Sequence, residues 1–143
     1  MGKFPANREY FQEAFLSEPL LFVYGTLRPG FDDPMADWLG KVARRAGRAV
    51  AQGRLYRVAS YPAFVPGGSD VVSGDLLALD DPAATLAVLD DYEECTGRFP
   101  EPHEYRRERL TVWGEKGPVE AWIYIYNRNV GALTRIESGD FLA

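Results

Sequence analysis

The sequence is poor in metal-ligating and disulfide-forming residues, with one cysteine, Cys95, and one histidine, His103, among 143 residues. A single cysteine excludes an internal disulfide and is typical of proteins from reducing compartments. These two residues cannot supply a zinc site with conventional ligands, and the carboxylates show no calcium-loop spacing. The glycines form no phosphate-binding loop. The sequence therefore shows no pattern typical of a zinc site, a calcium loop or a phosphate-binding loop.

Long apolar runs and an excess of positive charge are also missing. No stretch approaches the roughly 20 apolar residues of a membrane span, and the start Met1–Pro5 has no apolar run typical of a signal peptide. The formal net charge is −5, whereas nucleic-acid-binding domains usually carry a basic face. We expect a cytoplasmic protein that binds neither nucleic acid nor a membrane. The sequence leaves its oligomeric state open.

What is present fits one folded domain with a short extension. With 46% hydrophobic and 13% aromatic residues, a chain of this length can bury a sizeable core. Residues Asn7 to Leu16 carry aromatic and apolar side chains at helical spacing, which predicts a short amphipathic helix that Pro19 ends. We therefore divide the chain into an N-terminal helical extension, residues 1–19, and a main domain, residues 20–143.

The main domain has the pattern of several strands and few helices. Strands are predicted at Leu20–Tyr24, at Gly47–Val58 with a bend or bulge at Gly53, at Val71–Leu79 with a break at Gly74, at Tyr105–Trp113 and at Val119–Tyr126. Helices are predicted at Asp33–Leu39, with Asp33 as cap and Pro34 first, and at Pro82–Asp91, capped by Asp80 or Asp81. The last two strands should form an antiparallel hairpin. Without regular strand–helix alternation, the fold class is α+β.

The apolar run at Leu20–Tyr24 is followed at once by turn residues. Gly25, Pro29 and Gly30 end the strand abruptly. A strand that enters a tight glycine turn leaves backbone N–H groups able to hold a carboxylate or a developing oxyanion. Thr26 adds a hydroxyl at the same place. The residues alone equally allow a core strand followed by an ordinary surface turn, since most such turns only reverse the chain.

One carboxylate, Glu93, falls on the apolar stripe of the second predicted helix. Leu86, Leu89 and Glu93 stand at positions i, i+3 and i+7. Burial on that face raises the pKa of a carboxyl toward the range useful for proton transfer.

Further acids crowd the same helix end, where the helix dipole is already negative. We interpret Asp90, Asp91 and Glu94 as solvated. The alternative is a purely structural acidic end, neutralised by nearby arginines. The candidates are Arg98, Arg106 and Arg107.

Two short segments are distinctive, Tyr24-Gly25-Thr26-Leu27 and Leu89-Asp90-Asp91-Tyr92-Glu93. They resemble the Tyr-Gly-(Ser/Thr)-Leu loop and the Leu-Asp-x-(Tyr/Phe)-Glu segment of the gamma-glutamylcyclotransferase-like family. Similar segments in the family's order are Ser60–Ala63, Gly74–Leu77, Tyr105–Arg107 with Leu110–Val112, and Ser138–Phe141. The ordered combination, from about Leu20 to Phe141, carries the resemblance. One departure is Glu94, where the family commonly has glycine.

The resemblance implies a fold, a reaction and a set of site residues. The fold is a compact mixed β-barrel flanked by short helices, with the ligand in a cavity at one barrel end. The reaction is that of a cofactor-free cyclotransferase of the lyase or acyltransferase type. It releases 5-oxoproline from a γ-glutamyl amine or peptide, with Glu93 as general acid and base. Tyr24, Gly25, Thr26 and Leu27 would bind the glutamyl end, and Tyr105 would border the cavity. Glu93 and the Tyr24–Leu27 backbone should then line one cavity.

Two other functions remain open at this point. The same barrel could serve as a non-enzymatic small-molecule binding or interaction module, because a fold does not fix a function. The chain could also be a γ-glutamyl amide hydrolase in which Glu93 activates water. The sequence does not identify the leaving amine.

Overall fold

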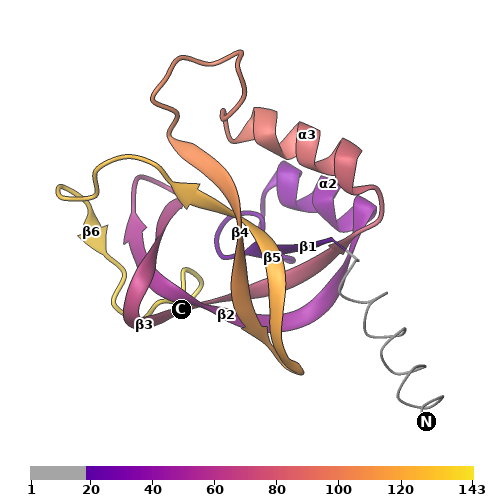
Figure 1. The fold of residues 1–143 in the computed structure, drawn as a ribbon, viewed down its shortest axis with the longest axis horizontal. Helices are drawn as coiled ribbons and strands as arrows, with labels where there is room; N and C mark the ends of the chain where they lie inside the picture. The colour runs from indigo at the N-terminus through magenta and orange to yellow at the C-terminus, as the bar shows by residue number, and fades with distance from the viewer. Residues whose placement is uncertain (1–18) are drawn as a thin grey trace, which may run out of the picture.

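The computed structural model describes residues 19–143, and the helix predicted at Asn7–Leu16 lies outside them. The described elements follow in the order β1 (Leu20–Val23), α2 (Pro34–Val42), β2 (Ala43–Arg57), β3 (Pro62–Leu79), α3 (Pro82–Tyr92), β4 (Tyr105–Gly114), β5 (Gly117–Tyr126) and β6 (Thr134–Arg135) (Figure 1). The predicted α+β class is confirmed.

The strands close into a barrel-like ring. Their order is β3-β1-β5-β4-β2-β6, and β2 also pairs with β3, so that five strands complete a circle. β1 runs parallel to β5, and every other pairing is antiparallel. The ring is uneven because β1 and β5 meet only at Leu21 and Trp122. The mixed barrel that the resemblance implied is therefore present in this form.

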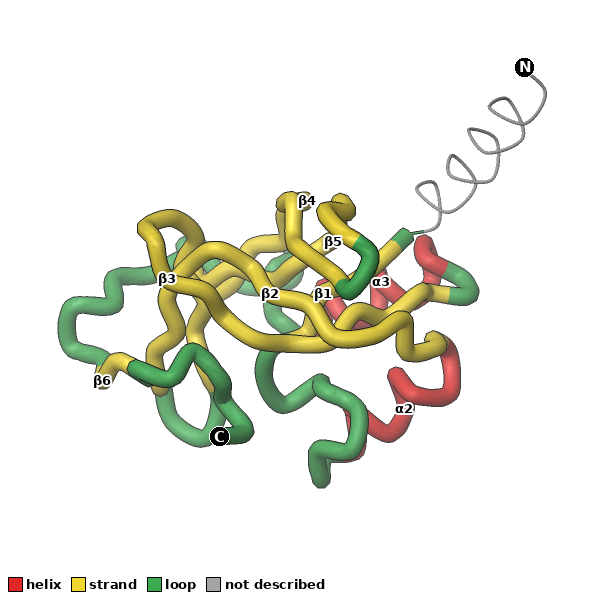
Figure 2. Tube along the Cα trace, turned by 90° about the horizontal axis from the view of Figure 1, so that it is seen from below, coloured by secondary structure: helices red, strands yellow, loops and turns green. Residues whose placement is uncertain are grey.

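The longest pairing joins β2 to β3, which run together along the sheet in Figure 2. The register shifts between Gln52 and Gly53, which confirms the predicted bulge. A Cβ atom on Gly53 would lie 2.6 Å from Cε1 of Phe64. The prediction that β3 begins at Val71 and breaks at Gly74 is wrong. The strand is continuous, because the missing side chain at Gly74 makes room for the ring of Phe22.

Helix starts follow the predicted caps. The Asp33 side chain accepts hydrogen bonds from the amides of Met35, at 2.8 Å, and Ala36, at 3.4 Å, with Pro34 in the first turn of α2. Asp81 caps α3 in the same way through the amide of Ala84 at 3.4 Å. Side-chain oxygens in these positions satisfy amides that have no partner within the helix. Along residues 19–143, no helix has both the length and the apolar character that crossing a bilayer requires.

The core consists of two apolar clusters that share strand β1. Phe22 faces the cluster inside the ring, with Phe64, whereas Leu21 and Val23 belong to a second cluster between the ring and the helices. Leu39 of α2 also contributes to the second cluster. Because β1 is buried on both faces, its sequence is a continuous apolar run and not an alternating one. The predicted hairpin of β4 and β5 is also confirmed.

Candidate active site

A cavity of about 340 Å³ opens to solvent where β1 ends. It is bordered by the turn after β1, the start of β3, the residues after α3 and the start of β4. The six predicted site residues all line it, namely Tyr24, Gly25, Thr26, Leu27, Glu93 and Tyr105. The structure thus brings together two segments that lie almost seventy positions apart in the sequence.

The turn after β1 lines this cavity and has backbone amides without a hydrogen-bond partner. The amide of Arg28 donates to the carbonyl oxygen of Gly25 at 3.1 Å and closes the turn. Within residues 19–143, the amides of Gly25, Thr26 and Leu27 donate no hydrogen bond, and the Thr26 hydroxyl has no hydrogen-bond partner. Consecutive N–H groups of this kind form a site for an anion or a polarised carbonyl oxygen.

Gly25 is required by close packing against the start of β3. A Cβ atom at this position would lie 2.5 Å from Cγ of Pro62, well inside van der Waals contact. The buried Tyr105 hydroxyl donates to the Pro62 carbonyl oxygen at 2.7 Å and holds this neighbour in place. Burial raises the pKa of Tyr105, so the phenol stays protonated and acts as a donor. Tyr105 therefore supports the turn through Pro62.

Tyr24 is fixed by its ring and by its hydroxyl. The ring packs against Phe64 with centroids 5.5 Å apart, and the hydroxyl donates to the carbonyl oxygen of Tyr124 at 2.5 Å. Burial raises the pKa of Tyr24 well above its ordinary value, as does the nearby Glu93 carboxylate. Tyr24 thereby anchors one end of the turn in the core.

Glu93 lies directly after α3, the helix whose apolar stripe it is predicted to continue. α3 ends at Tyr92, and Glu93 is its C-cap, with its amide donating to Leu89 at 2.8 Å. The side chain is half-buried, and across residues 19–143 its carboxylate has neither a hydrogen bond nor an ion pair. Burial, followed by the charges of Glu104, Asp90 and Glu94, raises the pKa of Glu93 to about 8. An unpartnered carboxyl of this pKa can take up and return a proton near neutral pH.

Comparison with known proteins identifies the family. Residues 21–143 match the family model described as gamma-glutamyl cyclotransferase, AIG2-like. The chain belongs to this family. It is 34% identical over 123 residues to the gamma-glutamylcyclotransferase family protein YtfP of Escherichia coli K12. The matched region covers 85% of this chain and 95% of YtfP.

Solved structures agree with the family match. The solution structure of E. coli YtfP superimposes with a TM-score of 0.62 at 33% identity, covering 86% of this chain and 96% of that one. An AIG2-like protein from mouse shares the fold, with a TM-score of 0.67 at 24% identity over 83% of this chain and 86% of that one. The predicted family and the predicted enzyme type, gamma-glutamylcyclotransferase-like, are confirmed.

The departure at Glu94 falls at a backbone position that favours glycine. Glu94 has φ of 58°, in the left-handed region. Its amide donates to Asp91 at 3.1 Å, and the amide of Cys95 donates to Asp90 at 3.0 Å. These two bonds define a Schellman motif, whose left-handed residue is usually glycine. The backbone at residue 94 therefore has a conformation that favours glycine, and Glu94 is conformationally strained there.

We expect the Glu94→Gly variant to be more stable than Glu94→Ala by about 1 kcal/mol, because only the alanine keeps a Cβ in the left-handed region. Both variants remove the same charge, so the pair isolates the backbone effect. Urea denaturation of the two proteins measures it. If the Glu94→Ala protein were as stable as the Glu94→Gly protein, residue 94 would not have a left-handed backbone conformation. We expect both proteins to fold, and we expect the same of the Asp91→Ala protein.

Two of the neighbouring acids are paired, which corrects the interpretation that Asp90 is solvated. Asp90 accepts hydrogen bonds from Nε of Arg107 at 2.7 Å, Nη2 of Arg107 at 2.9 Å and the Tyr124 hydroxyl at 2.8 Å. Asp91 binds Arg98, with Nη2 to Oδ2 at 2.6 Å. Asp90 and Asp91 are therefore neutralised by arginines, as the structural alternative predicts for the acidic end of this helix. Glu93 is not neutralised in this way.

Sequence reasoning missed other acids of the cavity. Glu104 lines it and accepts a hydrogen bond from the Tyr61 hydroxyl at 2.7 Å. The only signal for Glu104 is its position directly before Tyr105. Four carboxylates line the cavity, from Asp33, Glu93, Glu94 and Glu104, whereas no Lys, Arg or His of the described chain does. The cavity is consequently negative apart from its backbone amides.

Other candidate chemistries find no support in this geometry. Burial raises the pKa of Cys95 to about 11, and its thiol donates to Asp90 O at 3.5 Å. The Nε2 atom of His103 lies 3.3 Å from the Phe99 carbonyl oxygen, and neither side chain lines the cavity. Among residues 19–143, no group of three or more His, Cys, Asp or Glu side chains is placed to hold a metal ion.

Proposed function

We propose that this protein is a γ-glutamyl amine cyclotransferase that releases 5-oxoproline without a cofactor. One observation carries the proposal. An unpartnered carboxyl with a pKa of about 8, Glu93, lines the same cavity as three free backbone amides of the turn Gly25–Leu27. The family to which the chain belongs supports the choice of a γ-glutamyl substrate.

In the proposed reaction the substrate attacks itself. Its α-amino nitrogen adds to its own γ-carbonyl carbon and closes a five-membered lactam, while the bond from that carbon to the leaving nitrogen breaks. Holding the two groups together supplies the proximity that such a reaction needs, so no protein nucleophile is required. The amine gives one proton to Glu93, and Glu93 delivers it to the leaving nitrogen. Atoms and charge balance without any further reactant.

The turn after β1 would perform the electrostatic part of the reaction. Negative charge develops on the γ-carbonyl oxygen while the ring closes, and fixed N–H donors stabilise it without reorganising. The amides of Gly25, Thr26 and Leu27 are available for this oxygen or for the substrate's own carboxylate. Because Pro62 and Tyr24 hold the turn on both sides, the donors are fixed before the substrate arrives.

The charge of the cavity suggests which leaving amines are accepted. Besides the proton carrier Glu93, three carboxylates line the cavity, and none of the described lining residues carries a cationic side chain. A leaving group that carries its own carboxylate is therefore repelled. We expect kcat/KM to be at least about tenfold higher for the γ-glutamyl conjugate of ethylenediamine than for γ-glutamylglutamate, which corresponds to about 1.4 kcal/mol. The γ-glutamyl conjugate of propylamine, whose leaving group is uncharged, should fall between them.

This panel tests both the function and the selectivity by chromatography of the released products. Release of 5-oxoproline from any of the conjugates supports the cyclotransferase. Release of glutamate would support the hydrolase, and binding without turnover would support the binding module. A preference for γ-glutamylglutamate would contradict the charge argument and leave the reaction itself intact.

A further inference from the structure

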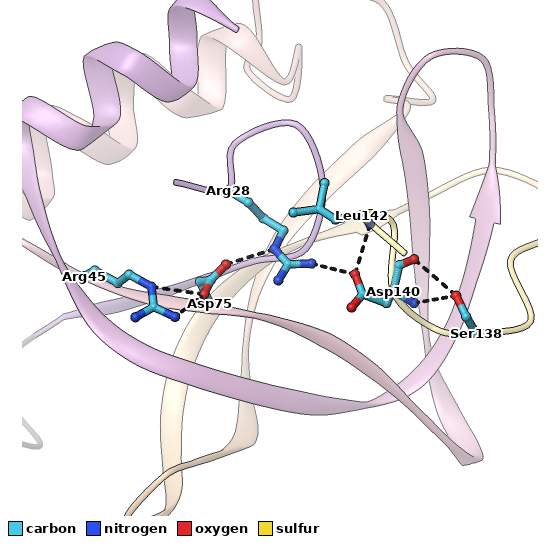
Figure 3. Close-up of polar contacts among 6 residues, drawn as sticks. All are labelled: Arg28, Arg45, Asp75, Ser138, Asp140 and Leu142. Atoms are coloured by element: carbon cyan, nitrogen blue, oxygen red, sulfur yellow. Dashed lines mark hydrogen bonds and ion pairs between the residues drawn. The ribbon is translucent and has the colours of Figure 1, made fainter. Parts of the chain in front are cut away.

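A buried ion cluster lies behind the turn that carries the free amides. Arg28 directly follows this turn and is only 4% exposed. Its Nε donates to Oδ2 of Asp75 at 2.9 Å, and its Nη1 donates to Oδ1 of Asp140 at 2.9 Å (Figure 3). Arg28 is not among the residues that line the cavity. Its guanidinium is thus occupied by protein carboxylates and is not placed to contact the substrate.

The first carboxylate, Asp75, ties both ends of the turn to the same point of β3. Asp75 is the register partner of Val23, the last residue of β1. Its side chain holds Arg28, whose amide closes the turn on Gly25. The three free amides therefore lie on a short loop that is pinned before and after.

The second carboxylate, Asp140, belongs to the C-terminal turn and is itself held firmly. Its Oδ1 accepts from the amide of Leu142 at 3.0 Å, and its own amide donates to Oγ of Ser138 at 3.2 Å (Figure 3). The turn is docked on β3, because the amide of Ser73 donates to the carbonyl oxygen of Gly139 at 2.8 Å. A Cβ atom on Gly139, which has φ of 71°, would overlap the Val71 carbonyl oxygen.

The cluster needs both carboxylates for charge balance. Asp75 is shared with Arg45, whose Nη2 lies 2.8 Å from Oδ1 of Asp75 and whose side chain is about half exposed. Without Asp140, the buried Arg28 would compete with Arg45 for a single carboxylate. A buried guanidinium that loses one of its partners moves to recover hydrogen bonds, because an unpaired buried charge is costly. Such a movement would shift the residue that closes the turn.

We infer that Asp140 is a positioning residue, which acts through Arg28 to fix the amides of Gly25–Leu27 for substrate binding. Its catalytic consequence rests on the proposed function. The C-terminal turn, more than a hundred residues from the loop in sequence, then becomes part of the active-site scaffold. This gives a role to the Ser138–Phe141 segment, which lies outside the cavity lining.

The test compares Asp140→Ala and Asp140→Asn with the control Arg45→Ala. Asparagine keeps an acceptor for Nη1 of Arg28 but loses the charge, whereas Arg45→Ala alters the same ion cluster at its exposed end. We expect kcat/KM for 5-oxoproline release to fall about tenfold in Asp140→Ala, mainly through a higher KM, and less in Asp140→Asn. Arg45→Ala should stay within about twofold of the wild type.

A second measurement does not depend on turnover. Nitrogen-15 relaxation of the Gly25, Thr26 and Leu27 amides should give order parameters near 0.85 in the wild type and clearly lower values in Asp140→Ala. Unchanged order parameters in Asp140→Ala would overturn the inference, whatever the activity. If the wild type turns over no γ-glutamyl compound, the proposed function fails, while loosened amides in Asp140→Ala would still support the positioning role.

Discussion

The Glu93→Gln variant is expected to release 5-oxoproline at about one hundredth of the wild-type rate or less, the usual scale for deleting a general acid–base. Glutamine keeps the size and polarity of the side chain but cannot take the proton from the attacking amine. Since the Glu93 carboxylate has no ion pair in residues 19–143, its replacement leaves no unpaired cation. The fold and the binding of 5-oxoproline should therefore survive, as circular dichroism and a binding titration would show.

Glu94→Gln is the matched control, because it makes the same chemical change at the next residue of the same cavity. We expect it to stay within a few-fold of the wild-type rate. If Glu93→Gln kept full activity, Glu93 would not be the proton carrier. If both variants lost activity equally, the effect would come from the cavity's charge and not from proton transfer at Glu93.

The raised pKa of Glu93 also predicts how rate and stability depend on pH. As a base, Glu93 must be ionised, so kcat/KM should fall about tenfold per pH unit below a pH of about 8. The folded-state pKa lies above the ordinary value of 4.5, so the folded state binds the proton more tightly than the unfolded one. The resulting stability is present below pH 4.5 and is lost as the pH rises through about 8. Glu93→Gln should then be more stable than the wild type above pH 8, and this difference should shrink as the pH falls.

The Gly25→Ala variant is expected to lose about a hundredfold in kcat/KM, because its new Cβ displaces the turn from Pro62. That Cβ would lie 2.5 Å from Cγ of Pro62 and 2.7 Å from its Cδ. Pro62 cannot yield freely, since its carbonyl oxygen is held by Tyr105 at 2.7 Å. A displacement of about 1 Å in a catalytic group can cost a hundredfold in rate. The overpacking should also lower the free energy of unfolding by about 1–3 kcal/mol.

Gly40→Ala provides the control for this substitution. Gly40 lies in α2, and no atom would come within 4 Å of a Cβ added there. Alanine at this helical position should leave kcat/KM unchanged and raise stability by about 0.5–1 kcal/mol. Steady-state kinetics and urea denaturation on both variants measure the two effects. A Gly25→Ala protein with wild-type kcat/KM would show that the turn does not serve the reaction.

Features of the fold that depend on local chemistry could be predicted from the sequence. The helix starts at Asp33 and Asp81 depend on side chains that cap amides two or three residues away. β1 was visible because a strand buried on both faces needs a continuous apolar run. The start and continuity of β3 could not be predicted in this way. They depend on pairing with β2 and on Phe22 packing over Gly74.

The main residues of the candidate site could be predicted because several motifs occur in the family's order along the chain. Local patterns alone would not have identified them. Glu93 was placed on an apolar stripe, and its pKa is indeed raised. Burial is the largest cause of the raised pKa, and the charge of Glu104 is the next. Glu104 belongs to a segment that only the folded ring brings near Glu93. The pairing of Asp90 with Arg107 of β4 likewise exists only in the folded barrel. The contribution of Glu104 has no signal in the spacing of residues along the chain, whereas Arg107 is one of the three arginines that the sequence offers as partners of the acidic helix end.

The central claim, ring closure by the substrate's own amine, is tested most directly by running the reaction in water labelled with oxygen-18. Purified protein is incubated with the γ-glutamyl conjugate of ethylenediamine, and the masses of the products are measured by mass spectrometry. Cyclisation takes no atom from water, so we predict 5-oxoproline without label and an equal amount of free ethylenediamine. Glutamate carrying one labelled oxygen would contradict this account and identify a hydrolase.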